Sequence, residues 1–268
     1  LVELNEVARQ QVLRLGSSYL RVAQGQALLG NWSSVDYWLA RSARDFPDPP
    51  FPIFSRWAAS DWQGRYAEAA AGIERSLSDR GLQLDEVGLD LAGWYGAMLA
   101  RAGEYERAIE VLDPRIEAEG SFLRNAPYDE TAYDGMHALA WSYLHTGAAN
   151  QAASLLAQVA RQCLEEAAAG RMHLSDHVYY CAENALLIGD EDRALARLER
   201  AVAAGWRDIY LREHDPYWAT LSDHPRYRRL MDEVRADVER QRAEIDALEP
   251  EAEFIARLDA ALAGRSEP

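Results

Sequence analysis

Residues 102–112 read AGEYERAIEVL: a glycine, then polar and aromatic residues, then small and apolar residues at helical spacing. Similar phrases begin at Gly30, Gly64, Gly147 and Gly189. Each follows a run of about a dozen helix-forming residues and precedes another such run. A glycine between two such runs is typical of a turn, because glycine readily adopts the left-handed backbone that ends a helix. The pattern therefore predicts a series of helix–turn–helix units.

The composition agrees with a helical protein. The chain has 268 residues, of which 49% are hydrophobic and 27% are charged, enough for a continuous core and a solvated surface. Alanine, leucine, arginine and glutamate are abundant, and all four favour helices. Long runs of alternating β-branched residues, which would indicate strands, are absent. The composition predicts an all-α fold.

The spacing of the turn glycines suggests a repeat. Gly30 and Gly64 are 34 positions apart, and the later intervals are 39, 44 and 42 residues. When the turn glycines are aligned, small and large apolar residues recur at matching positions. In the third to fifth units these residues are Ala92, Tyr95, Gly96, Leu99, Ala108 and Leu112, then Met136, Leu139, Ala140, Tyr143, Ala152 and Leu156, then Val178, Cys181, Ala182, Ala185, Ala194 and Leu198.

This arrangement resembles tetratricopeptide (TPR) repeats, whose period is 34 residues. The resemblance covers residues 19–204 and implies a right-handed α-solenoid of about five helix pairs. An N-terminal helix at residues 1–18 precedes this array in our prediction, and capping helices at residues 205–268 follow it. A terminal cap is needed because each helix pair buries its apolar face only against a neighbour.

The C-terminal part carries a second resemblance. Gly205-Trp206 is followed by Asp215-Pro216-Tyr217-Trp218 and by Asp223-His224-Pro225-Arg226-Tyr227. Each aspartate resembles a helix cap followed by proline at a first helical position. The segment is similar to the end of the TPR sensor halves of bacterial winged-helix transcription regulators and class III adenylate cyclases. We expect its aromatic side chains, Trp206, Tyr217, Trp218 and Tyr227, to cover the last repeat.

Charge and residue types exclude several functions. The net charge of −16 repels phosphate backbones, so we expect no direct binding of nucleic acid by this segment. All 28 basic residues are arginine, which excludes chemistry that requires lysine. No apolar run approaches the ~18 residues of a membrane span. The two cysteines, Cys163 and Cys181, form no metal-binding pair, and we expect two buried free thiols, with a disulfide as the alternative.

One stripe of side chains is the candidate site. Counted from the turn glycines, a set of positions on the first helices of units three to five faces the inner groove of a repeat array. The set is Arg101, Asp134, His137, Trp141, His145, Asp176, Tyr179 and Glu183. Exposed aromatic and histidine side chains flanked by carboxylates suit a peptide or a small polar ligand. The alternative is that longer helices fill this groove with their own side chains.

A metal site is the competing interpretation of the histidines. His173, Asp176 and His177 lie within about one helical turn, and histidines at i and i+4 share a helix face. No third histidine or cysteine accompanies them at ligand spacing, and Ser175 or Asp176 also fits a helix cap. His137 and His145 are ~12 Å apart along a helix and cannot share a metal. We therefore expect no metal and no cofactor.

These observations predict a non-catalytic module that binds a protein or peptide. By the resemblance, it is the sensory or docking half of a bacterial signalling or transcription-regulatory protein. One alternative is a free-standing scaffold that forms homo-oligomers, and another is a metal-dependent hydrolase that uses the histidine stripe. The sequence leaves the compartment open between the cytoplasm and, for a membrane-anchored regulator, the periplasm.

Overall fold

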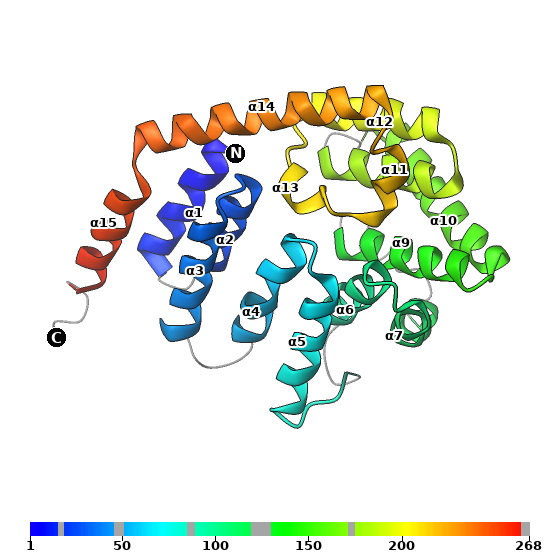
Figure 1. Cartoon of the computed structure of the whole chain (residues 1–268), viewed down its shortest axis with the longest axis horizontal. Helices are drawn as coiled ribbons and strands as arrows, with labels where there is room; N and C mark the ends of the chain where they lie inside the picture. The colour runs from blue at the N-terminus through cyan, green and yellow to red at the C-terminus, as the bar shows by residue number, and fades with distance from the viewer. Residues whose placement is uncertain (16–18, 46–50, 85–88, 119–129, 171–174, 264–268) are drawn as a thin grey trace. The chain divides into compact units, whose positions relative to one another are not determined.

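The computed structural model describes residues 1–15, 19–45, 51–84, 89–118, 130–170 and 175–263. These residues form helices, turns and short connections, and no strand is found among them, so the predicted all-α class is confirmed. Figure 1 labels the elements in chain order. Their bounds are α1 (Val2–Leu15), α2 (Tyr19–Leu28), α3 (Trp32–Asp45), α4 (Phe51–Trp62), α5 (Tyr66–Ser78), α6 (Leu89–Arg101), α7 (Tyr105–Ala118), α9 (Glu130–His145), α10 (Ala149–Ala168), α11 (Ser175–Ile188), α12 (Glu191–Ala203), α13 (Ile209–Arg212), the 3-10 helix η2 (Pro216–Leu221), α14 (Pro225–Leu248) and α15 (Glu251–Ala263).

A helix lies on each side of every turn glycine, as predicted. The glycines separate α2 from α3, α4 from α5, α6 from α7, α9 from α10 and α11 from α12. Their φ angles range from 67° at Gly30 to 90° at Gly189, which is the left-handed region. The amide next to the glycine closes the helix end: Glu104 N donates to Leu99 O at 2.9 Å, and Asp190 N donates to Ala185 O at 2.9 Å.

The described helices include none with both the length and the hydrophobicity that a membrane crossing requires.

The chain divides into two compact units. Unit 1 comprises Leu1–Gly64, Arg207–Glu213 and Met231–Pro268, and unit 2 comprises Arg65–Trp206 and His214–Leu230. The predicted domains, in contrast, are consecutive stretches with boundaries near residues 18 and 204. The two divisions differ because contacts define the units, and the C-terminal stretch has contacts in both of them.

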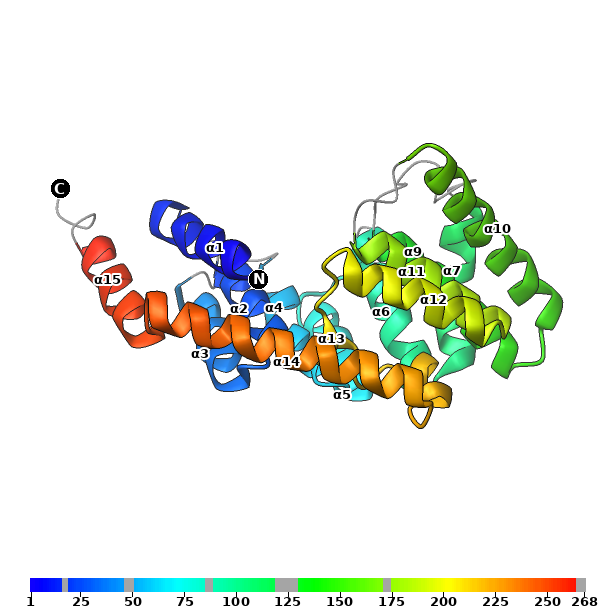
Figure 2. The ribbon, with the colours of Figure 1, turned by 90° about the horizontal axis from the view of Figure 1, so that it is seen from above.

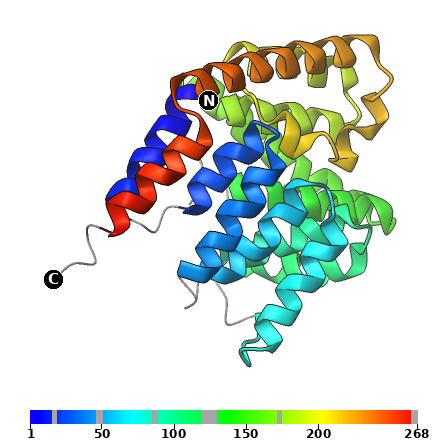
Figure 3. The ribbon, with the colours of Figure 1, turned by 60° about the vertical axis from the view of Figure 1, so that its left-hand side comes forward.

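In unit 1 the core joins the two ends of the chain. The fully buried indole of Trp38 on α3 packs against Phe254 on α15, with ring centroids 5.6 Å apart. The indole Nε1 of Trp38 donates to Glu251 Oε1 at 2.8 Å. Figure 3 shows α15 beside α1. The prediction that all of residues 205–268 cap the last repeat is therefore wrong for α15, because its apolar side chains pack on the first helices.

In unit 2 the helices that precede the turn glycines pack against one another. Helix α6 packs on α9, α9 packs on α11, and each also packs on the helix that follows its own turn (Figure 2). Ala108 on α7 is completely buried, as its register predicts. A Cβ added at Gly96 of α6 would lie 2.6 Å from Cδ2 of Leu112 on α7, so glycine is required for this close approach.

Cys163 of α10 and Cys181 of α11 form a disulfide, with their Cα atoms 6.0 Å apart. The prediction of two free thiols is wrong. Both residues are buried, as the helical register predicts for Cys181. Register places a residue on one side of its own helix, but whether two cysteines meet depends on how α10 packs on α11.

Candidate functional site

The candidate residues all lie in unit 2, on the helices that the glycine register predicts. Arg101 ends α6, four of them lie on α9, and the other three lie on α11. We call the side of these helices that carries the eight residues the α6–α9–α11 face. Three pairs of them are in direct contact: Arg101 forms an ion pair with Asp134, His137 Nδ1 shares a hydrogen bond of 2.7 Å with Glu183 Oε1, and the rings of Trp141 and His145 pack together.

A short segment of the same unit, Asp215–Leu221, packs on the α6–α9–α11 face. Arg101 Nε donates to Asp215 Oδ2 at 3.1 Å. The ring of Tyr217 lies 5.2 Å from that of Trp141, and the ring of Trp218 lies 5.8 Å from that of Tyr179. The segment therefore contacts residues of all three helices.

Most of this face is not exposed. The side chains expected to be exposed but found buried are Arg101, Asp134, His137, Tyr179 and Glu183. The prediction of exposure is wrong for these five. Arg101 contacts Asp215 and Tyr217, Tyr179 contacts Trp206 and Trp218, and His137 and Glu183 pair with each other. The alternative in which longer helices fill the groove differs from this arrangement, because Asp215, Tyr217 and Trp218 belong to a later segment. Whether the eight residues bind a ligand stays a prediction.

The open end of the face lies at the C-terminal end of α9. Trp141 is half-buried and His145 is exposed there, whereas Asp176, also half-buried, lies at the start of α11. The His145 ring stacks on Tyr105 with centroids 4.3 Å apart, and it lies 4.1 Å from the ring of Trp141. His145 Nδ1 is 2.9 Å from the carbonyl oxygen of Trp141, which holds the imidazole beside the indole. These three aromatic side chains are accessible to a partner.

The charges beneath the segment are strongly coupled. Burial lowers the pKa of Arg101, but the carboxylates of Asp134 and Asp215 outweigh burial and hold this pKa well above its ordinary value. Burial also raises the pKa of Tyr217, with Arg101 opposing the effect and the carboxylates of Asp215, Asp134 and Glu183 reinforcing it. The guanidinium is therefore charged and the phenol neutral at any physiological pH, so the site holds a fixed cation between two carboxylates.

Several buried polar atoms of the site have no hydrogen-bond partner among the described residues. Two belong to the face, His137 Nε2 and Glu183 Oε2. Two belong to the segment that covers it, the Tyr217 hydroxyl and Trp218 Nε1. Buried polar groups are normally hydrogen-bonded, because an unmade bond costs free energy. The segment therefore supplies a carboxylate to Arg101 but leaves these four polar atoms without hydrogen bonds among the described residues.

The metal interpretation has no support in the part of the chain that the structure describes. No three histidine, cysteine, aspartate or glutamate side chains come together there as a group of metal ligands. His177 is buried on α11, with its ring 5.9 Å from that of Tyr133. His173, the other histidine of that motif, lies outside the described residues.

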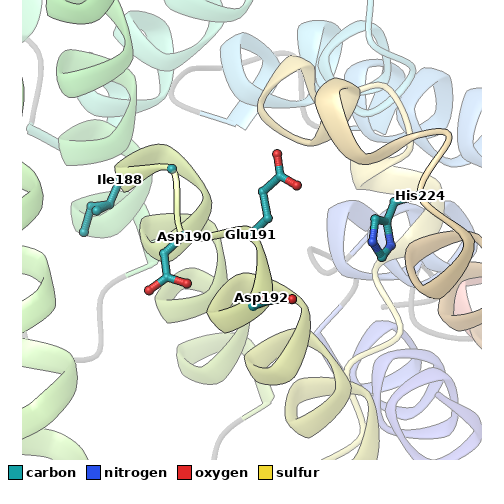
Figure 4. A pocket seen from close by; sticks show the side chains of 6 residues that line it. Ile188, Asp190, Glu191, Asp192 and His224 are labelled. Carbon is teal, nitrogen blue, oxygen red and sulfur yellow. The ribbon is translucent and has the colours of Figure 1, made fainter.

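Apart from the α6–α9–α11 face, a hollow lies at the turn between α11 and α12 (Figure 4). It measures about 480 Å³ and is lined by Ile188, Gly189, Asp190, Glu191, Asp192 and His224. Asp190 already caps α12, with its carboxylate accepting from Arg193 N at 3.1 Å. An acidic run at the start of a helix is ordinary capping chemistry, so the sequence of this turn does not indicate a site.

Asp215 and Tyr217 are site residues that the sequence pattern did not indicate, although their local structure is as predicted: Asp215 caps η2 by accepting from Tyr217 N at 3.0 Å, and Pro216 starts the helix. Of the aromatic rings expected over the last helix pair, Trp206 stacks on Tyr179 of α11 at 4.7 Å and Tyr227 stacks on Trp218 at 5.6 Å. That they cap a repeat array stays a prediction. The contact between Arg101 and Asp215 could not be seen in the sequence, because the two residues are 114 positions apart.

No family model, no curated protein and no solved structure matches the chain. Its function is therefore inferred from its own residues and their geometry.

Proposed function

We propose that the chain is a non-catalytic helical-repeat module that binds a peptide or protein segment on the α6–α9–α11 face. One observation carries the proposal: this face already holds a short peptide segment, Asp215–Leu221 of the chain itself. Arg101 binds the carboxylate of that segment, while Trp141 and Tyr179 contact its two aromatic rings. A surface built in this way recognises a peptide through one charged anchor and two aromatic anchors.

The finer architecture belongs to the same proposal. The five glycine-centred helix pairs support a TPR-like array with the right-handed superhelix of that repeat. In such an array the helices that precede the turns share one face, which accounts for a single stripe across α6, α9 and α11. The side chains of these helices then present one continuous binding surface.

In the wider role that we propose, the module is the sensory or docking half of a bacterial signalling or transcription-regulatory protein. The support is the similarity of residues 205–227 to the ends of TPR sensor halves. Of the two compartments that this role allows, the Cys163–Cys181 disulfide favours an oxidising one such as the periplasm. The net charge of −16 disfavours a partner that is acidic over its whole length.

The proposal is tested by selecting random displayed peptides on the full chain and measuring their affinity for variants of the open end. Trp141→Ala and His145→Ala remove accessible aromatic surface, and we expect the affinity of selected peptides to fall by ~2 kcal/mol, about thirtyfold, for Trp141→Ala. Because Trp141 is only half-buried, its replacement should lower the melting temperature less than loss of a fully buried tryptophan.

Leu164→Ala is the matched control, since Leu164 is an exposed apolar side chain on α10, away from the eight residues. Its affinity for the selected peptides should equal that of the wild type. If the selected peptides bind the Trp141 and His145 variants as tightly as they bind the wild type, the α6–α9–α11 face is not the binding surface.

A further inference from the structure

We propose that the partner of the α6–α9–α11 face is a peptide with one carboxylate followed closely by two aromatic side chains, and that Asp215–Leu221 is a resident competitor which this peptide displaces. The inference rests on the proposed function and names both its ligand class and its regulation. Two observations carry it: the contacts that hold the segment on the face, and the buried polar atoms that have no hydrogen bond while the segment is in place.

The carboxylate requirement follows from Arg101. Its side chain is almost completely buried between the carboxylates of Asp134 and Asp215, and its guanidinium lies 5.2 Å from the centroid of the Tyr217 ring. Departure of the segment removes Asp215 and leaves Nε of a buried cation without its acceptor. The guanidinium keeps its ion pair with Asp134, but a buried N–H without an acceptor is costly. The ligand that replaces the segment therefore has to bring an acceptor to the same place, and a carboxylate matches the one that leaves.

The aromatic requirement follows from the rings on the face. Trp141 of α9 contacts Tyr217, and Tyr179 of α11 contacts Trp218. Both segment residues are buried, so they supply most of the apolar surface that this contact removes from water. A replacing peptide needs two rings at the same spacing from its carboxylate, which is two and three residues after the aspartate.

The reason for displacement is the set of unmade hydrogen bonds. While the segment is in place, His137 Nε2 and Glu183 Oε2 on the face have no partner among the described residues, and neither do the Tyr217 hydroxyl and Trp218 Nε1. A peptide that offers hydrogen-bonding groups to His137 Nε2 and Glu183 Oε2, and whose own polar groups are all hydrogen-bonded, makes bonds that the segment does not make. The segment compensates through its covalent attachment, which gives it a roughly millimolar effective concentration. A free peptide therefore displaces the segment only when its affinity and concentration together exceed those of the attached segment.

The test measures binding of a fluorescent peptide, HDPYWATLS, which copies residues 214–222, to the full chain. Asp215→Asn is the main variant: asparagine still caps a helix, but the segment no longer supplies a carboxylate to Arg101. We expect this variant to bind the peptide about tenfold more tightly than the wild type does. A peptide with asparagine in place of its aspartate should lose that gain.

Asp223→Asn is the matched control, because the Asp223 side chain is fully exposed and lies just beyond the segment. It should bind the peptide with wild-type affinity. Equal affinity of the wild type and Asp215→Asn, or equal affinity of the aspartate and asparagine peptides for Asp215→Asn, overturns the proposal. Concentration-dependent dimers of the wild type that the peptide dissociates would make a second copy the occupant and overturn it as well.

Tyr217→Phe decides the question if Asp215→Asn does not fold. It removes a buried hydroxyl without a partner, which strengthens the resident segment. The peptide should therefore bind this variant about threefold to tenfold more weakly than it binds the wild type. Unchanged or tighter binding contradicts a competitor role. If peptides selected at random depend on Trp141 while these variants have no effect, the inference fails and the proposed function stands; if none depends on Trp141 or His145, the proposed function fails.

Discussion

Gly96 and Gly25 are both glycines inside helices, but their surroundings are opposite. At Gly96, a Cβ would collide with the buried side chain of Leu112. At Gly25 on α2, a Cβ would meet no atom within 4 Å. Glycine in a helix interior costs stability relative to alanine unless packing requires it. Replacing each glycine by alanine therefore measures two different effects: the gain in helix propensity alone at Gly25, and the same gain together with a steric clash at Gly96.

We expect Gly96→Ala to lower the free energy of unfolding by ~1–3 kcal/mol, because the added methyl overpacks the approach of α6 to α7. Gly25→Ala, the matched control, should raise it by ~0.5–1 kcal/mol, because alanine restricts the unfolded chain and fits the helix. Urea unfolding of both variants measures the difference. A stabilising Gly96→Ala would show that α6 and α7 are further apart than described.

A second pair of substitutions tests the register of α7. Ala108→Glu places a charge at a completely buried position and should cost several kcal/mol. Glu104→Ala removes only a partly exposed carboxylate that pairs with Arg107 at the surface, so its effect should stay within about ±0.5 kcal/mol. Thermal melts of both variants provide the measurement, and equal melting temperatures would contradict the register.

At the scale of the element, two connections determine how unit 2 is held together. The segment around η2 joins the C-terminal part of the chain to α6, α9 and α11 through one ion pair and two ring contacts. The Cys163–Cys181 disulfide joins α10 to α11 across the connection between consecutive helix pairs. The first is noncovalent, as the proposed competitor role requires, whereas the second is a covalent bond between neighbouring pairs.

Replacing both cysteines by serine should lower the free energy of unfolding by about 3 kcal/mol. The reason is that the bond joins residues 18 positions apart and so restricts the unfolded chain. Reductant should lower the melting temperature of the wild type and leave that of the double variant unchanged. Labelling with a thiol reagent in denaturant, without prior reduction, gives the decisive control. Two reactive thiols per wild-type chain under these conditions would rule out the disulfide.

At the scale of the whole molecule, the C-terminal stretch contributes to both compact units. Residues 214–230 belong to unit 2, where Tyr217 and Trp218 are buried. Residues 231–268 belong to unit 1, where Phe254 and Leu258 are buried. Removal of all residues after 205 therefore exposes apolar surface in each unit, and we expect such a truncated chain to aggregate or to lose part of its structure.

A shorter truncation distinguishes the two units. A chain that ends at residue 248 loses α15 but keeps residues 214–230, so amide hydrogen exchange should accelerate in α1 to α3 and stay slow in α9 to α12. Phe254→Ala should have the same regional effect and cost unit 1 ~3–5 kcal/mol, because its side chain is completely buried.

Leu248→Ala is the control for that experiment, since Leu248 is highly exposed at the end of α14 and its loss should change little. Uniform acceleration of exchange in every helix of the truncated chain would mean that the chain unfolds as one cooperative body.

By itself, the sequence determined the all-α class, the five turn glycines, the helix on each side of them and the cap at Asp215. These features depend on residues within about one helix of each other, where helix propensity and the left-handed backbone of glycine decide the outcome. The placement of the eight candidate residues on α6, α9 and α11 follows from the same local register.

Only the tertiary structure decided what those residues meet. Arg101 and Asp215 are 114 positions apart, and Trp38 and Glu251 are 213 positions apart, yet each pair is hydrogen-bonded. Burial of His137 and Glu183, and pairing of Cys163 with Cys181, likewise depend on which helix surfaces come together. Helical periodicity specifies one side of each helix, but the partner of that side depends on packing among all the elements of a unit, to which residues distant in the chain contribute.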